Sequence, residues 1–320
     1  MSDHLQVKNA PGRIVHIINP GAGSKNDGKI KETVGKAGGE ILNIGDTRVR
    51  EAVCDLFTKD PFAHAVVYGG DGTVFETVNG IFDSGAEKTA TFSVVPTGSG
   101  NDFSTYVNDS GEFPRRELVK IDVVKTVSGE VTRYFANMMN VGFDCAVVEE
   151  TLRLKDKPLF SGKNGYLAAA FKVMLQKKTT ALDITFKDFY DIKTGEIIPE
   201  TDFSKKVLLC AVANGKFCGG GFKAAPLSSL NDSFSDVVIA NDVSRRKFIS
   251  IIGNYRKGNY ISDKGELLRS FKDVIDYRRC RKMTIVGAET FCLDGEIFKT
   301  GEDKKIDVET IHCALGYIPL

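Results

Sequence analysis

Three glycine-rich turns in the first third of the chain constrain its fold most strongly, because each follows a short apolar segment. The turns are residues 19–23, 69–73 and 96–102, and the segments before them are residues 14–18, 63–68 and 91–95. A short apolar run that ends in Gly, Pro, Asn or Asp is typical of a β-strand followed by a turn. A further strand is predicted at residues 40–44.

Helical composition separates these strands, in residues 25–36, in residues 49–57 and from the second turn to residue 82. Strands that alternate with helices predict a parallel sheet covered on both faces. Loops at the carboxyl ends of such strands are the usual ligand-binding positions. All three glycine-rich turns are expected there.

The turn at residues 69–73 contains three glycines and Asp71. Glycine removes the side chains that would block close approach of the backbone, and N–H groups at the start of a helix bind phosphate oxygens. Asp71 does not favour a bare phosphate, so it indicates a magnesium ion, another cation or a hydroxyl nearby. A plain tight turn with an Asp cap is the alternative for this turn taken alone.

The turn at residues 96–102 adds two hydroxyl groups, from Thr97 and Ser99, and places Asn101 or Asp102 to cap the next helix. None of the three turns is a Walker A loop or a G-x-G-x-x-G fingerprint. Three phosphate-compatible turns on one sheet edge therefore predict a nucleotide site of unusual type.

Beyond about residue 121 the pattern changes to strands with few helical residues between them. The predicted strands are residues 121–124, 131–139, 182–186, 207–214, 236–241 and 283–286, and the convincing helices are residues 165–176 and 245–258. This pattern predicts an antiparallel β domain, a sandwich.

Composition narrows the class of protein. The net charge of +1 argues against a nucleic-acid binder. Up to Asp122 there are 13 Lys and Arg against 17 Asp and Glu, so the rest of the chain is more basic. That excess favours contact with an anionic membrane surface, although chance scatter also explains it. The basic cluster at residues 278–282 could touch headgroups or form a solvated strand rim.

The location is predicted from what the chain lacks. Seven scattered cysteines without a C-x-x-C pair fit reduced thiols in the cytoplasm, and the polar residues 1–13 do not resemble a signal peptide. No segment approaches the length of a membrane-spanning helix. The sequence leaves a homodimer open.

The three turns, taken in order with Ile121-Asp122, the Asn140–Asp144 segment and Leu293-Asp294-Gly295-Glu296, resemble the diacylglycerol kinase catalytic family, which includes bacterial lipid kinases and the sphingosine and ceramide kinases. The resemblance implies an N-terminal Rossmann-like three-layer α/β nucleotide domain at residues 1–122 plus about 306–320. It implies a C-terminal antiparallel β-sandwich lipid-substrate domain at residues 123–305. The active site is expected in the cleft between them, with ATP and Mg²⁺ as cofactors and a membrane lipid as substrate.

Carried over position by position, the resemblance also implies the nucleotide contacts. They are Asn19, Thr47, Gly69, Gly70, Asp71, Gly72, Thr73, Val74, Phe75, Gly98, Ser99 and Asn101. Asp71 and Asp122 are expected to influence the placement of a metal or cation. Ser99 stands where the family usually has Thr.

The resemblance assigns the catalytic base to Asp294 or Glu296, because a lipid alcohol needs a proton acceptor at neutral pH. It also implies a structural magnesium site with Asp232 as side-chain ligand and Ser229 and Phe234 as backbone ligands. Ser233 replaces the usual glycine there, so a simple turn cap is the alternative for Asp232. The expected reaction is diacylglycerol to phosphatidic acid. The alternatives are a kinase for a soluble acceptor such as NAD, or a catalytically silent nucleotide-binding protein.

Overall fold

The computed structural model describes residues 12–19, 34, 40–42, 44, 48–154, 169, 172–173, 176, 179–192 and 194–320. It divides the chain into two compact units. Unit 1 contains the chain up to Val123 together with His312–Leu320, and unit 2 is Val124–Ile311. Strand β5 (Val119–Ser128) leaves unit 1 and strand β14 (Lys305–Tyr317) returns to it.

Unit 1 is built on a parallel sheet. The sheet consists of β2 (Glu40–Leu42), β1 (Ile14–Ile18), β3 (His64–Gly69), β4 (Thr91–Pro96) and the end of β14, in that spatial order. All of these neighbours pair in parallel, and Gly316 and Tyr317 of β14 lie beside Thr91 and Phe92 of β4. Strands β1, β3 and β4 are largely buried apolar segments, as strands covered on both faces must be. The predicted parallel sheet is confirmed.

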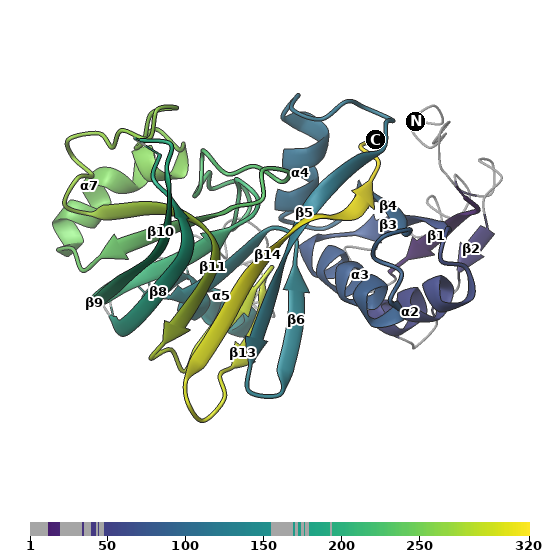
Figure 1. Cartoon of the computed structure of the whole chain (residues 1–320), viewed down its shortest axis with the longest axis horizontal. Helices are drawn as coiled ribbons and strands as arrows, with labels where there is room; N and C mark the ends of the chain where they lie inside the picture. The colour runs from purple at the N-terminus through teal and green to yellow at the C-terminus, as the bar shows by residue number, and fades with distance from the viewer. Residues whose placement is uncertain are drawn as a thin grey trace. The chain divides into compact units, whose positions relative to one another are not determined.

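In the described residues of unit 1, the periodic segments form three helices. They are α2 (Val49–Lys59), α3 (Asp71–Ser84) and α4 (Asp102–Asp109). Helices α2 and α3 pack together on one face of the sheet, and α4 lies on the other face (Figure 1). The helix predicted at residues 25–36 falls almost entirely outside the described residues.

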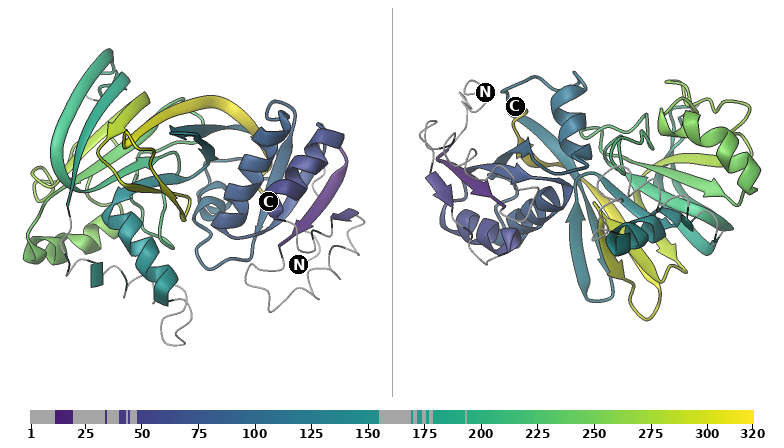
Figure 2. Two further views of the ribbon diagram at one scale, coloured as in Figure 1. Left: turned by 90° about the horizontal axis from the view of Figure 1, so that it is seen from below. Right: turned by 180° about the vertical axis from the view of Figure 1, so that it is seen from behind.

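Unit 2 is an antiparallel β unit, as predicted. One path of paired strands runs β13 (Glu296–Lys299), β12 (Thr290–Leu293), β7 (Met138–Gly142), β9 (Ile197–Ala213), β10 (Ser235–Asn241), β11 (Ile275–Val286) and the start of β14. Strand β8 (Thr180–Tyr190) pairs with β9 and β11, and β5 pairs with β6 (Val131–Phe135). The β8–β9 pair forms a long ribbon (Figure 2).

Two helices of unit 2 are described over their full length, α5 (Phe143–Leu154) and α7 (Arg245–Arg256). The second was predicted and the first was not. The predicted strand at residues 131–139 is divided into β6 and β7. The break occurs because the Ala136 and Asn137 amides, which lie between the two strands, donate to the carboxylate of Asp294. Strands β9 and β11 are longer than predicted because each changes partner along its length.

No helix in the described part of the chain combines the length and apolar character that crossing a membrane requires.

Candidate active site

The turn after β3 is held against the end of β1. Gly70 precedes the first turn of α3, and its carbonyl accepts hydrogen bonds from the amides of Thr73 and Val74. The Asn19 side-chain amide donates to Thr73 Oγ1 at 3.0 Å. Two of the predicted turns therefore meet through side chains. Residues 20–23 and Thr47 lie outside the described residues.

The turns after β3 and β4 touch through bare backbone. A Cβ atom added at Gly98 would lie 2.5 Å from Gly70 Cα, which real Cβ atoms essentially never show. The Thr97 amide donates to the Gly69 carbonyl at 3.0 Å. Glycine is required at position 98, because the two loops approach there more closely than a side chain allows, and a Cβ atom at Gly70 would be tight at 3.0 Å. Ser99 is exposed beside this contact, whereas Val74 and Phe75 are buried within α3.

Asp71 caps a helix other than its own. Its Oδ1 atom accepts the Phe103 amide of α4 at 3.1 Å, and a Cβ atom at Gly100 would lie 2.7 Å from its Oδ2 atom. Burial raises the pKa of Asp71, although hydrogen bonds from backbone amides work against the rise. A nearby cation would stabilise the charged carboxylate, so this position is compatible with the magnesium ion that accompanies a nucleotide.

Asn101 does not use its side chain to cap α4, which differs from the expectation. The residue has φ 59°, and its side-chain amide bonds back to both the amide and the carbonyl of Gly98, at 3.0 and 2.7 Å. Asn tolerates the left-handed region better than most residues, so it can close this loop. The turn after β4 is therefore fixed from within.

Asp122 is fully buried and holds the returning strand β14. Its Oδ1 atom accepts the Cys313 amide at 2.7 Å and lies 2.8 Å from His312 Nδ1. Cys313 has φ 50°, which breaks the alternation of the strand. The Asp122, His312 and Cys313 ligand atoms lie within 4.8 Å of one another, but magnesium prefers oxygen ligands. No sequence signal could pair Asp122 with His312, because 190 residues separate them.

In unit 2, Asp294 and Gly295 form the two-residue turn between β12 and β13. Both have positive φ, 47° and 96°, as in the turns that match the twist of a hairpin. The buried Asp294 carboxylate accepts three backbone amides: Ala136 at 3.1 Å, Asn137 at 3.2 Å and Met138 at 2.7 Å. Glu296, the first residue of β13, is exposed. The two acidic residues of this motif therefore have different environments.

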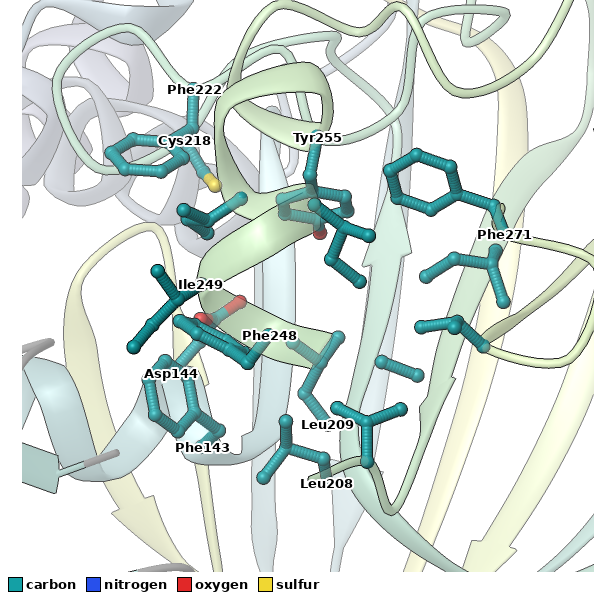
Figure 3. A pocket seen from close by; sticks show the side chains of 16 residues that line it. Phe143, Asp144, Leu208, Leu209, Cys218, Phe222, Phe248, Ile249, Tyr255 and Phe271 are labelled. Atoms are coloured by element: carbon teal, nitrogen blue, oxygen red, sulfur yellow. The ribbon is translucent and has the colours of Figure 1, made fainter. Parts of the chain in front are cut away.

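An apolar cavity of about 330 Å³ lies in unit 2 between α5, α7 and strands β9, β10 and β11. Its wall is almost entirely aliphatic and aromatic, and Phe248 and Ile249 of α7 belong to it (Figure 3). Among the described residues that line it, Asp144 alone is acidic. Its apolar surroundings raise the pKa of Asp144 to about 6, and no described residue donates a hydrogen bond to its carboxylate. The sequence placed Asp144 in a family segment but gave it no role.

Asp232, the side-chain ligand expected at the structural magnesium site, is already engaged. Asp232 Oδ1 accepts the Phe234 amide at 3.0 Å, and its Oδ2 atom contacts the Arg279 guanidinium. Ser233 adopts φ 68°, and the Ser229 hydroxyl donates to Asn231 Oδ1 at 2.9 Å. Because a guanidinium is already bound to this carboxylate, the described side chains do not fit a magnesium ion on Asp232.

Two known domains account for most of the chain. Residues 13–134 match the diacylglycerol kinase catalytic domain, and residues 137–298 match the YegS C-terminal NAD kinase beta sandwich-like domain. The chain belongs to this lipid kinase family. It is a kinase, and its α/β unit followed by an antiparallel β unit is the family's arrangement.

Relatives of this lipid kinase are similar along much of its length. It is 26% identical over 313 residues to "Putative lipid kinase YtlR" of Bacillus subtilis, covering 89% of this chain and 93% of that one. It is 28% identical over 207 residues to the diacylglycerol kinase of the same organism, covering 62% and 61%. A crystal structure of a "putative diacylglycerol kinase" from Bacillus anthracis str. Sterne covers 98% of each chain at 18% identity with a TM-score of 0.68, which supports the fold.

Proposed function

We propose that this kinase transfers the γ-phosphoryl group of ATP, with Mg²⁺, to the hydroxyl of a membrane lipid, and that diacylglycerol is the acceptor. The observation that carries the nucleotide part is the backbone contact between Gly70 and Gly98 in unit 1. Two loops without side chains at their meeting point expose amides where phosphate oxygens can bind. The diacylglycerol kinase of Bacillus subtilis supports the choice of lipid.

Within unit 1, the amides at residues 69–73 and the Ser99 hydroxyl would hold the phosphates. Asp71 would accompany the magnesium ion, since positive charge would stabilise a carboxylate whose charged form burial disfavours. When bound, the ion neutralises negative charge on the phosphates. Such electrostatic stabilisation supplies most of the rate enhancement in phosphoryl transfer. Asp122 contributes by keeping β14 in the sheet.

The base is proposed to be Glu296, with Asp294 as a positioning residue. Both oxygens of Asp294 already accept backbone amides, whereas Glu296 is exposed at the start of β13. As the lipid oxygen bonds to the γ-phosphorus and the bond to ADP breaks, the hydroxyl proton would pass to the Glu296 carboxylate. Asp294 would keep the hairpin against the β6–β7 connection.

The cavity of unit 2 supports a lipid acceptor over NAD. An apolar wall can bury hydrocarbon but offers little to a dinucleotide. Helix α7 begins with Arg245, Arg246 and Lys247, and Ile249 of the same helix lines the cavity while 60% exposed. Basic residues beside an exposed apolar side chain are suited to the surface of an anionic membrane, from which the lipid would enter.

The substrate is tested by incubating the protein with labelled ATP and Mg²⁺ in three reactions. One contains vesicles of phosphatidylglycerol with diacylglycerol, one contains the vesicles alone, and one contains NAD without vesicles. Labelled phosphatidic acid in the first reaction only is the expected result. Labelled NADP would overturn the lipid assignment, and ATP binding without a labelled product would indicate a silent nucleotide-binding protein.

The base is tested with Glu296→Gln and Asp294→Asn. Glu296→Gln should lower kcat by roughly 10²–10⁴-fold with little change in Tm, because glutamine keeps the size of this exposed side chain but cannot accept the proton. Asp294→Asn should lower both kcat and Tm, because an amide NH₂ would face backbone donors. Full turnover by Glu296→Gln would show that this residue is not the base.

A further inference from the structure

Arg279 lies between two carboxylates in unit 2. Its guanidinium contacts Asp232 Oδ2, and its Nε atom is 3.2 Å from Asp236 Oδ1. The side chain is only 15% exposed. The strand register explains part of this arrangement, because Arg279 of β11 lies directly opposite Asp236 of β10. Asp232 is brought in from the loop before β10.

Two aromatic rings hold the guanidinium in place. Its carbon lies 5.4 Å from the Tyr190 ring centre and 5.5 Å from that of Phe234. Phe234 belongs to the same loop as Asp232, so the arginine binds this loop through both a carboxylate and a ring. A planar guanidinium suits this combination better than an ammonium group does. The loop at residues 229–234 is thereby attached to β8 and β11.

The charges around this site require a cation. Asp236 is fully buried, and the Arg279 guanidinium lies against both the Asp236 and the Asp232 carboxylates. Two carboxylates this close to one another repel unless positive charge lies between them.

We propose that Arg279 takes the place of the structural magnesium ion that the family resemblance implies, so unit 2 fixes the Asp232 loop without a divalent cation. The guanidinium supplies the positive charge, and the Phe234 amide satisfies the other Asp232 oxygen. The charge is part of the chain and cannot be removed by a chelator. The stability of this unit is therefore independent of magnesium, whichever acceptor the kinase uses.

The test measures Tm without nucleotide, in EDTA and in millimolar Mg²⁺. The wild-type Tm should be the same in both buffers. Arg279→Met should lower Tm in EDTA by on the order of 10 °C, because it removes the cation beside the buried Asp236 carboxylate and the half-buried Asp232 carboxylate. Millimolar Mg²⁺ should then restore part of the loss. The Tm of Arg279→Lys in EDTA should lie between those of wild type and Arg279→Met, since lysine keeps the charge but not the planar group.

Arg281→Met is the matched control. Arg281 lies on the same strand and also covers the Phe234 ring, at 4.9 Å, but no ion pair joins it to Asp232 or Asp236. Its substitution should have a smaller effect that Mg²⁺ does not reverse. A second comparison with Asp71→Asn removes any contribution of magnesium in unit 1.

The wild-type protein decides the question even if Arg279→Met fails to fold. A wild-type Tm that falls in EDTA and returns with Mg²⁺ would overturn the proposal, provided that Asp71→Asn shows the same response. Elemental analysis that finds a tightly held magnesium in wild type, lost in Asp232→Asn, would overturn it as well.

Discussion

Aspartate residues show how strongly position controls the role of a side chain in this kinase. Asp71 caps a helix that belongs to the next turn, Asp294 binds three amides of another connection, and Asp144 faces an apolar cavity. The three are chemically identical in the sequence. The surrounding residues determine whether each carboxylate accepts hydrogen bonds from backbone amides, as Asp71 and Asp294 do, or lines an apolar cavity, as Asp144 does.

Asp144 should make the stability of unit 2 depend on pH. Its pKa of about 6 in the folded protein exceeds the ordinary value of 3.8, so the folded state binds the proton more tightly than the unfolded state. The free energy of unfolding therefore contains a contribution that is present below pH 4 and is lost as the pH rises from about 4 to about 6. Asp144→Asn should remove this loss and be more stable than wild type at pH 8, by at most about 3 kcal/mol.

Urea unfolding at pH 4, 5, 6 and 8 checks the Asp144 prediction. Asp263→Asn serves as the control, because Asp263 is exposed. The difference in unfolding free energy between Asp144→Asn and wild type should grow across this range, while that of the control stays constant. A constant difference for Asp144→Asn would mean that the cavity does not perturb this carboxyl.

At the scale of elements, the meeting of the β3–α3 and β4–α4 turns depends on glycine. Gly98→Ala would place Cβ 2.5 Å from the Gly70 backbone, so the two turns must separate. We expect ATP to bind at least about tenfold more weakly to Gly98→Ala, a loss of about 1.4 kcal/mol, with a lower Tm. Titration calorimetry with a non-hydrolysable ATP analogue measures the affinity.

The control for Gly98→Ala is Gly253→Ala in α7. Nothing lies within 4 Å of a Cβ atom at Gly253, and alanine favours helix over glycine by roughly 0.5–1 kcal/mol. This variant should keep its nucleotide affinity and match or exceed the wild-type Tm. Unchanged nucleotide binding by Gly98→Ala would remove the two turns from the proposed phosphate seat.

At the scale of the whole molecule, unit 1 is built from two separate parts of the chain. Residues His312–Leu320, which follow unit 2 in the sequence, belong to unit 1. Leu315, Tyr317 and Ile318 are fully buried, the Ile318 carbonyl accepts the Ser93 hydroxyl, and the Pro319 carbonyl accepts the Arg116 amide. Deletion of His312–Leu320 should therefore unfold unit 1 and abolish nucleotide binding. The strands of unit 2 that do not pair with β14, such as β9 and β10, should stay folded.

Amide hydrogen exchange measures this difference directly. In the truncated protein the amides of β3 and β4 should lose protection, whereas those of β9 and β10 should keep it. Deletion of Leu320 alone is the control, because that residue is only partly buried and should leave protection nearly unchanged. Intact protection of β3 in the longer deletion would show that unit 1 folds without its returning strand.

The amino-acid sequence by itself determined the order of strands and helices in unit 1 and the position of its turns. Those features depend on local properties: apolar runs, helical periodicity and glycine at tight turns. The same local signals predicted α7 and most strands of unit 2, but not the break between β6 and β7, because that break depends on Asp294, more than 150 residues away.

Tertiary structure alone decided which charged groups meet. Arg279 reaches Asp232 across 47 residues, and Asp122 reaches β14 across 190. The sequence left Arg279 in a basic cluster that could touch headgroups or form a solvated strand rim, whereas the register of β10 and β11 places it against a buried carboxylate. A local pattern cannot encode such pairs, because the free energy that favours them arises only after the strands have brought the groups together and removed them from water.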